Sequence, residues 1–183
     1  LELHRNKNLL EQYNVRFQPG INEELGATAV WGSQQVNLFE GATVDGVCGI
    51  WYGKSPGVDR STDVFRHGNA AGSSEKGGVL VVVGDDHGCK SSSYPGQSEF
   101  AFVDVQIPVL NPADVQEVLD YGRYGIELSR YSGCWVAMIT LSENMDSAAV
   151  VNVDEHRLRI SHPANHQLPL SLIHISEPTR LHG

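Results

Sequence analysis

The sequence has little of what defines several large classes of protein. Its three cysteines, Cys48, Cys89 and Cys134, form no CxxC pair or cluster spacing, so neither a structural zinc site nor an iron–sulfur site is encoded. No apolar run approaches the roughly 18 residues of a membrane span. Lysine and arginine number 13 against 22 acidic residues, a net charge of −9. This balance argues against nucleic acid or a membrane as a partner.

The cysteine pattern fits a reducing compartment, and no signal peptide opens the chain, so we expect a cytoplasmic protein. Cys48 and Cys134 lie in apolar runs, which predicts that both are core residues. Hydrophobic residues make up 40% of the chain, enough for a folded core.

Two nucleotide-binding motifs are also missing, and a hydrolase motif is missing around the serines of the polar loop. There is no GxGxxG, and the turn at residues 53–55 (Gly-Lys-Ser) lacks the earlier glycine of a phosphate-binding loop, because that position is Cys48. No Gly-x-Ser-x-Gly surrounds the serines at 91–93, so a serine hydrolase is not expected. Lys54 and Arg60 therefore either face an anionic ligand or form part of a solvated turn.

The most informative stretch present is the apolar run at residues 79–83. Five consecutive apolar residues between a glycine pair and a polar loop predict a strand buried on both faces of a parallel sheet. In such sheets ligands bind beyond the carboxyl ends of the strands. The polar side chains that follow this strand are Asp85, Asp86, His87, Lys90, Ser91, Ser92 and Ser93.

Strand and helix patterns alternate along the rest of the chain, which predicts an α/β fold with a parallel sheet flanked by helices. We expect strands at 15–18, 44–52, 79–83, 107–110 and 135–140. We expect helices at 1–14, 22–36, 58–69, 97–104 and from Pro112 onward, the last capped by Asn111, with Val115, Val118, Leu119, Gly122 and Ile126 as its buried stripe.

Two carboxylates begin the second of these helices. Asn22 is expected to cap it, and Glu23 and Glu24 occupy its first turn. Acidic residues there complement the helix dipole, which explains them without any function. The functional alternative is a carboxylate presented in a crevice, with Gly26, Ala27 and Ala29 leaving room for a ligand.

Asp85, Asp86 and His87 could together bind a metal, as in a metal hydrolase. No further carboxylate or histidine follows at helical or hairpin spacing, so the sequence predicts no metal site here. A polar turn that ends a buried strand is the simpler interpretation.

Several segments together resemble one family. GINEELGATAVWGSQQ (20–35), GGVLVVVGDDHGCKSS (77–92), Gln-Ser-Glu (97–99) and IPVLNPADVQEVLDYG (107–122) are similar to the pyrimidine-binding domain of indolepyruvate:ferredoxin oxidoreductases. DGVCGIWYGKSPGVDRSTDVFRHGN (45–69) resembles the long, fused form of that enzyme. The resemblance covers roughly residues 13 to 155.

The resemblance implies a thiamine diphosphate-binding fold whose cofactor is shared with a second, diphosphate-binding domain. It implies that Glu23 is the catalytic glutamate that bonds the aminopyrimidine ring, in a partly buried site, and that Glu24 lies on the surface. It also implies cofactor-facing positions for Asn22, Glu23, Lys54, Asp85, Asp86, His87, Ser91 and Ser92.

The chain also departs from the family. The Gly-Asp-Gly and following Asn that hold diphosphate and Mg²⁺ are absent, as are cluster cysteines, so Mg²⁺ and [4Fe-4S] clusters are expected only in a missing part of the parent. We expect a domain at 1–155 that is truncated at its N-terminus, a linker or frayed segment at 156–169, and a non-native tail at 170–183. That tail, LSLIHISEPTR onward, resembles translated sequencing adapter.

The expected function is therefore that of a fragment, inactive alone, of an enzyme that oxidatively decarboxylates 2-oxo acids such as indolepyruvate. The expected partners are the 2-oxo acid, ferredoxin, and a diphosphate-binding domain of the same parent or a second subunit. Two alternatives remain open: a thiamine-dependent decarboxylase or transferase, and a non-catalytic domain that serves as an assembly interface. The substrate side chain, the electron acceptor and the oligomeric state are not fixed by the sequence.

Overall fold

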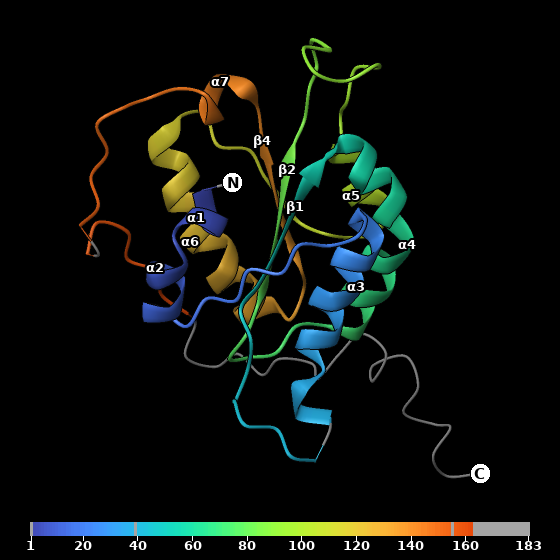
Figure 1. The fold of residues 1–183 in the computed structure, drawn as a ribbon, viewed down its shortest axis with the longest axis vertical. Helices are drawn as coiled ribbons and strands as arrows, with labels where there is room; N and C mark the ends of the chain where they lie inside the picture. The colour runs from blue at the N-terminus through green and yellow to red at the C-terminus, as the bar shows by residue number, and fades with distance from the viewer. Residues whose placement is uncertain (1, 39, 155, 163–183) are drawn as a thin grey trace.

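The computed structural model describes residues 2–38, 40–154 and 156–162, and within them it has an α/β architecture (Figure 1). Parallel strands form a four-stranded sheet in the order β1-β2-β4-β3. The strands are β1 (Gly49–Lys54), β2 (Val79–Gly84), β3 (Val109–Leu110) and β4 (Val136–Thr140). The fold class predicted from the alternation of elements, a parallel sheet flanked by helices, is confirmed.

Helices cover both faces of this sheet. α3, α4 and α5 lie on one side and α6 lies on the other, as Figure 1 shows. The helices are α1 (Glu2–Arg5), α2 (Lys7–Gln12), α3 (Glu23–Gln34), α4 (Ser55–Ala71), α5 (Glu99–Asp104), α6 (Val115–Ser132) and α7 (Ser142–Met145), with a 3₁₀ turn η1 (Val36–Leu38).

The core has two parts, one on each face of the sheet. On the α4 side, Trp51 and Trp135 each pack edge-on to the ring of Phe65, with centroids 5.1 and 6.0 Å away. On the α6 side, Leu80 packs with Met138 and Val136. Because β2 contributes to both parts, it is buried on both faces, as the apolar run predicted.

Two predictions near the N-terminal half are wrong. Residues 15–18 form no strand, and β1 begins at Gly49 rather than at residue 44. Since Cys48 therefore precedes the strand instead of lying within it, the residue is exposed and is not part of the core; Cys134 is partly buried. Although the residue as a whole is exposed, neighbouring groups keep part of the water from its thiol, and this desolvation raises the pKa of Cys48; Arg130 opposes the effect and Glu127 reinforces it.

The start of α6 also differs from the prediction. Asp114, not Asn111, is the N-cap: its Oδ1 accepts the N–H of Glu117 at 2.8 Å. The Glu117 carboxylate in turn accepts the N–H of Ala113 at 2.7 Å. This reciprocal cap outcompetes the cap at Asn111 because it satisfies two backbone donors at once.

The buried face of α6 is shifted from the predicted stripe. Leu119 is 44% exposed, whereas Gly125 and Ser129 are buried. A Cβ on Gly125 would lie 2.7 Å from Leu80 Cδ1, so the helix approaches β2 closely at this point. The hydroxyl of Ser129 accepts the N–H of Val79 and fixes the amino end of that strand.

The carboxyl ends of β1 and β2 lie at the same edge of the sheet. β1 runs directly into α4, while β2 is followed by a long loop, residues 85–98, that projects beyond the sheet (Figure 1). Residues 156–162, predicted as part of a linker, are tied to α6 by an ion pair between Arg157 and Asp120. The remainder of that segment and the predicted tail at 170–183 lie outside the described residues.

Candidate functional site

The N-terminus of α3 is fixed by two hydrogen bonds. The Asn22 side chain caps the helix and accepts the N–H of Leu25 at 2.8 Å, as predicted. The indole Nε1 of Trp51 donates to the carbonyl of Glu23 at 3.0 Å. Since Trp51 is a core residue of β1, the backbone of Glu23 is held against the sheet.

The Glu23 side chain lies over the first turn of α4. A Cβ on Gly57 would lie 2.6 Å from Glu23 Cγ, and Arg60 Nη1 is 3.6 Å from Glu23 Oε2. The Glu23 side chain is 44% exposed, so the partly buried setting expected for it is not found. Glu24 is exposed, as predicted.

Glu23 borders a groove of about 770 Å³ beside β1, which we call the β1 groove. Gly26 and Ala29 line it, whereas Ala27 points into the core. Among the predicted site residues, Asn22 and Glu23 line this groove. Its walls come from three segments: residues 16–23, the inner face of α3, and residues 47–52 with Arg60.

The loop at residues 85–98, which we call the β2 loop, is organised around Asp86. The Asp86 carboxylate accepts the N–H groups of Lys90 and Ser91, both at 2.8 Å. These bonds from Ser91 and Lys90, with a smaller contribution from the Lys54 charge, hold the pKa of Asp86 below its ordinary value. Asp86 therefore stabilises the conformation of the loop, because its carboxylate is hydrogen-bonded to the loop backbone.

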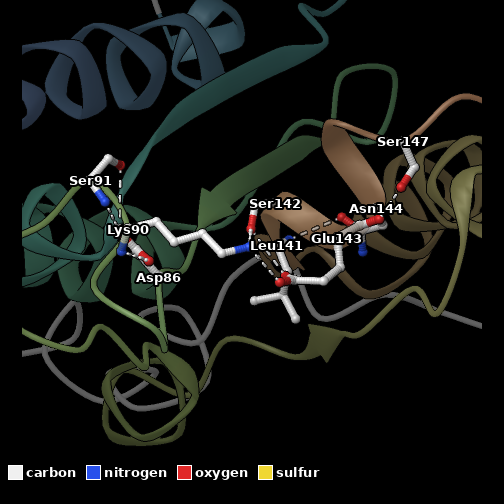
Figure 2. Close-up of polar contacts among 8 residues, drawn as sticks. All are labelled: Asp86, Lys90, Ser91, Leu141, Ser142, Glu143, Asn144 and Ser147. Atoms are coloured by element: carbon white, nitrogen blue, oxygen red, sulfur yellow. Dashed lines mark hydrogen bonds and ion pairs between the residues drawn. The ribbon is translucent and has the colours of Figure 1, made fainter.

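Two lysines tie the β2 loop to its neighbours. Lys54 Nζ donates to both the carbonyl and the hydroxyl of Ser91, at 2.8 and 2.9 Å. Lys90 reaches across to α7, where it bonds Ser142 and pairs with Glu143 at 2.9 Å, as Figure 2 shows. Lys54 therefore already bonds Ser91, and an anionic ligand would have to compete with Ser91 for the ammonium group of Lys54.

Asp85 is turned into the protein. It is 4% exposed, and its two carboxylate oxygens accept the hydroxyl and the N–H of Ser98 at 2.6 and 2.8 Å. Its own N–H donates to the carbonyl of Thr140. His87 and Ser91 are exposed, and Ser92 is partly buried.

The predicted site residues thus fall into two groups. Asn22 and Glu23 belong to the β1 groove, and the others, Lys54, Asp85, Asp86, His87, Ser91 and Ser92, belong to the β2 loop and its base. The first two turns of α4 stand between them, since they follow Lys54 and carry Gly57 and Arg60.

Sequence reasoning did not give a role to Trp51 or Glu99. Trp51 anchors Glu23 across 28 residues, a separation for which a single sequence carries no signal. Glu99 lies in α5, and one of its carboxylate oxygens comes within 4.8 Å of ligand atoms of Asp85 and His87. The sequence signal that pointed to Glu99 was its place in the Gln-Ser-Glu segment at residues 97–99, which is one of the segments that carry the family resemblance.

The fold and these sites define an α/β domain with polar groups gathered at the carboxyl ends of its strands. No protein-family model matches the chain, and no curated protein matches it. Within the described ranges, none of the helices has both the length and the apolar character needed to cross a bilayer.

Proposed function

We propose that this chain is the pyrimidine-binding domain of a thiamine diphosphate-dependent enzyme that oxidises 2-oxo acids, indolepyruvate or a related aryl pyruvate among them. The observation that carries the proposal is the position of Glu23: an exposed carboxylate at a fixed helix N-terminus, bordering an open groove. Trp51 bonds the backbone carbonyl of Glu23, so the point at which the side chain leaves the helix is fixed beside the groove.

The groove residues fit the aminopyrimidine half of the cofactor. The Glu23 carboxylate can accept a hydrogen bond from a protonated ring nitrogen, and Gly26, which has no side chain, leaves room beside it. When bound, thiamine diphosphate supplies the nucleophilic carbon and the electron sink for decarboxylation. The task of Glu23 is then to hold or share the proton at the ring nitrogen, and Arg60 limits where its carboxylate can point.

The other half of the site has to come from elsewhere. The sequence lacks the diphosphate and Mg²⁺ signature and the cluster cysteines, so we assign these, and electron transfer to ferredoxin, to a partner domain of the parent. The chain alone is then inactive, and its expected location is the cytoplasm. Only the assembled enzyme can be used to assay turnover.

The test is a pair of substitutions in the full-length protein, with 2-oxo acid-dependent reduction of a viologen dye as the assay. Glu23→Gln removes the proton-sharing carboxyl and should lower kcat about 10²–10⁴-fold. Glu24→Gln, one residue along the same exposed turn, is the matched control and should leave kcat unchanged. Equal activity in the two variants would refute the catalytic role.

Calorimetry with thiamine diphosphate and Mg²⁺ tests whether the present chain contains only half of the cofactor site and the full-length protein contains all of it. We expect binding by the full-length protein and not by the present chain alone. If neither binds, the thiamine assignment is wrong, whatever the result of the dye assay.

A second candidate function, an assembly interface, is favoured by one observation. On the edge strand β1, Ile50 and Tyr52 are 57% and 59% exposed. An uncovered apolar edge strand is a surface that another chain can pair with or pack on. Sedimentation of the wild-type chain and of Ile50→Lys tests it: a dimer that the substitution dissociates would support assembly, and a monomer in both would remove it.

A further inference from the structure

The base of the β2 loop contains polar atoms whose hydrogen-bonding capacity is unused. In the part of the chain that the structure describes, the buried side-chain oxygens without a hydrogen-bond partner include Ser55 Oγ, Ser92 Oγ and Glu99 Oε2. The last of these is a carboxylate oxygen. Burying such an atom unpaired is costly, so it points to a group that is bound there.

Three metal-ligating side chains meet at this point. Asp85 ends β2, His87 follows in the β2 loop, and Glu99 begins α5. Each offers one ligand atom, and these atoms all lie within 4.8 Å of one another. The spacing 85, 87 and 99 is neither a helix nor a hairpin pattern, which is why the sequence predicted no metal site.

Among the described residues, the two carboxylates in this cluster lack a lysine or arginine partner. Over residues 2–38, 40–154 and 156–162, neither Asp85 nor Glu99 forms an ion pair with a lysine or arginine. The lysines of this region are used elsewhere, Lys54 by Ser91 and Lys90 by Glu143. Asp85 is buried and Glu99 is partly buried, and two acidic groups this close to each other need a counter-charge.

Asp86, the residue beside them, does not belong to the cluster. Its oxygens are taken by the N–H groups of Lys90 and Ser91. Asp85, in contrast, is held by the N–H and hydroxyl of Ser98, which orient its carboxylate and leave a further lone pair on each oxygen. Hydrogen bonds of this kind commonly orient the carboxylate ligands of metals.

We propose that Asp85, His87 and Glu99 bind a divalent transition-metal ion of the zinc type. One imidazole nitrogen and two carboxylate oxygens suit Zn²⁺ and leave a fourth position for water or a substrate atom. Zinc bonds to nitrogen and oxygen are about 2.0–2.2 Å long, and in a tetrahedral site they place the ligand atoms roughly 3.3 Å apart. The three side chains therefore have to move closer together when the ion binds. His87 can provide this movement because it is exposed on the loop.

This metal site does not depend on the role proposed for Glu23. Its ligands do not line the β1 groove, and Glu23 is not among them. Loss of the metal site therefore leaves the Glu23 proposal standing, and failure of the Glu23 test does not touch the metal site.

The experiment is calorimetric titration of Zn²⁺ into the full, chelator-treated chain and into three variants. His87→Gln and Glu99→Gln each remove one ligand. Loss of a supporting partner already weakens metal binding by about 10–100-fold, so loss of a direct ligand should cost at least as much. His67→Gln is the matched control, because His67 is also an exposed histidine beside a carboxylate, 3.6 Å from Asp63.

The proposal predicts a tight site in the wild type and in His67→Gln, weakened in both His87→Gln and Glu99→Gln. Co²⁺ in place of Zn²⁺ should give the visible absorption of a four-coordinate site, lost in the same two variants. Circular dichroism checks that all variants are folded. Absence of binding in the wild type would overturn the proposal, and so would binding that His87→Gln and Glu99→Gln leave unchanged, which would assign it to other histidines.

Discussion

Glu23 in the β1 groove and Asp85 at the base of the β2 loop are both carboxylates at the edge of the sheet where the strands end, yet their surroundings are opposite. Glu23 is 44% exposed, and the described contact of its carboxylate is the 3.6 Å approach of Arg60. Asp85 is 4% exposed and accepts two hydrogen bonds from Ser98. The first is available to a ligand from solvent; the second is held in one orientation by the fold, with a further lone pair left on each oxygen.

The sequence alone does not distinguish Glu23 from Asp85, but their surroundings in the structure do. In the sequence, both segments show acidic residues after a predicted strand. What distinguishes them is whether backbone donors reach the carboxylate, as Ser98 reaches Asp85 and as Lys90 and Ser91 reach Asp86. The contrast predicts large stability effects in the β2 loop and small ones in the β1 groove.

The largest effect is expected for Asp85→Ala. The substitution leaves the N–H and hydroxyl of Ser98 buried without an acceptor, which should lower the free energy of unfolding by about 2–4 kcal/mol. Urea unfolding in the presence of chelator measures it. Asp85→Asn keeps one acceptor oxygen and should lose less, and Glu24→Ala, on the exposed turn of α3, should change the stability by less than about 0.5 kcal/mol. Equal losses of unfolding free energy for Asp85→Ala and Glu24→Ala would show that the hydrogen bonds of Asp85 add nothing to stability, which would contradict the contrast between the β2 loop and the β1 groove.

Gly96→Ala should follow in size. A Cβ at this position would lie 1.8 Å from Ser55 Oγ, at the contact between the β2 loop and the first turn of α4. We expect a loss of about 1–3 kcal/mol from this overpacking. The double variant with Ser55→Gly removes the clashing atoms and should recover part of the loss, so the two changes should be non-additive. Additive losses would show that Gly96 is needed for some other reason.

Local patterns in the sequence were sufficient for most of the elements but not for their contacts. The run at residues 79–83 predicted β2, because continuous burial on two faces requires continuous apolar residues. Asn22 was recognised as a cap because a cap acts over three residues. The start of α6 was misplaced since two caps, Asn111 and Asp114, compete within four residues and only the reciprocal bond from Glu117 decides between them.

For the candidate sites, sequence distance was the limit. The bond between Asp85 and Ser98 spans 13 residues of irregular loop, and the contact between Glu23 and Arg60 spans two helices. No period of 2 or 3.6 relates such pairs. The sequence therefore indicated which residues lie at the ends of the strands, and the tertiary structure sorted them into bound and available groups.

Asp86 offers a test of the loop by pH. Its pKa is lowered in the folded protein by the N–H groups of Ser91 and Lys90, so the ionised carboxylate favours the folded state at pH values above its ordinary pKa of 3.8. That contribution is lost as the pH falls through the lower, folded pKa. Asp86→Asn should remove this part of the acid sensitivity, giving a flatter dependence of the urea midpoint on pH below about 5. Asp120 and Glu143, whose pKa values are also lowered, remain in both proteins. Parallel curves for wild type and variant would contradict the assignment.

The smallest effect on stability is expected in the β1 groove, for Gly57→Ala. The new Cβ would meet Glu23 Cγ at 2.6 Å, but an exposed side chain can move aside, and alanine favours the helix by up to about 1 kcal/mol. The net change in unfolding free energy should therefore stay within about 0.5 kcal/mol. Under the proposed function, the same change in the full-length protein displaces the Glu23 carboxylate from its position over α4, so it should reduce kcat while leaving the fold intact. Ala29→Gly, on the inner face of α3, is a control that also alters the groove lining but leaves Glu23 in place. A Gly57→Ala enzyme with full activity would mean that the position of the Glu23 side chain seen here is not the one that matters for catalysis.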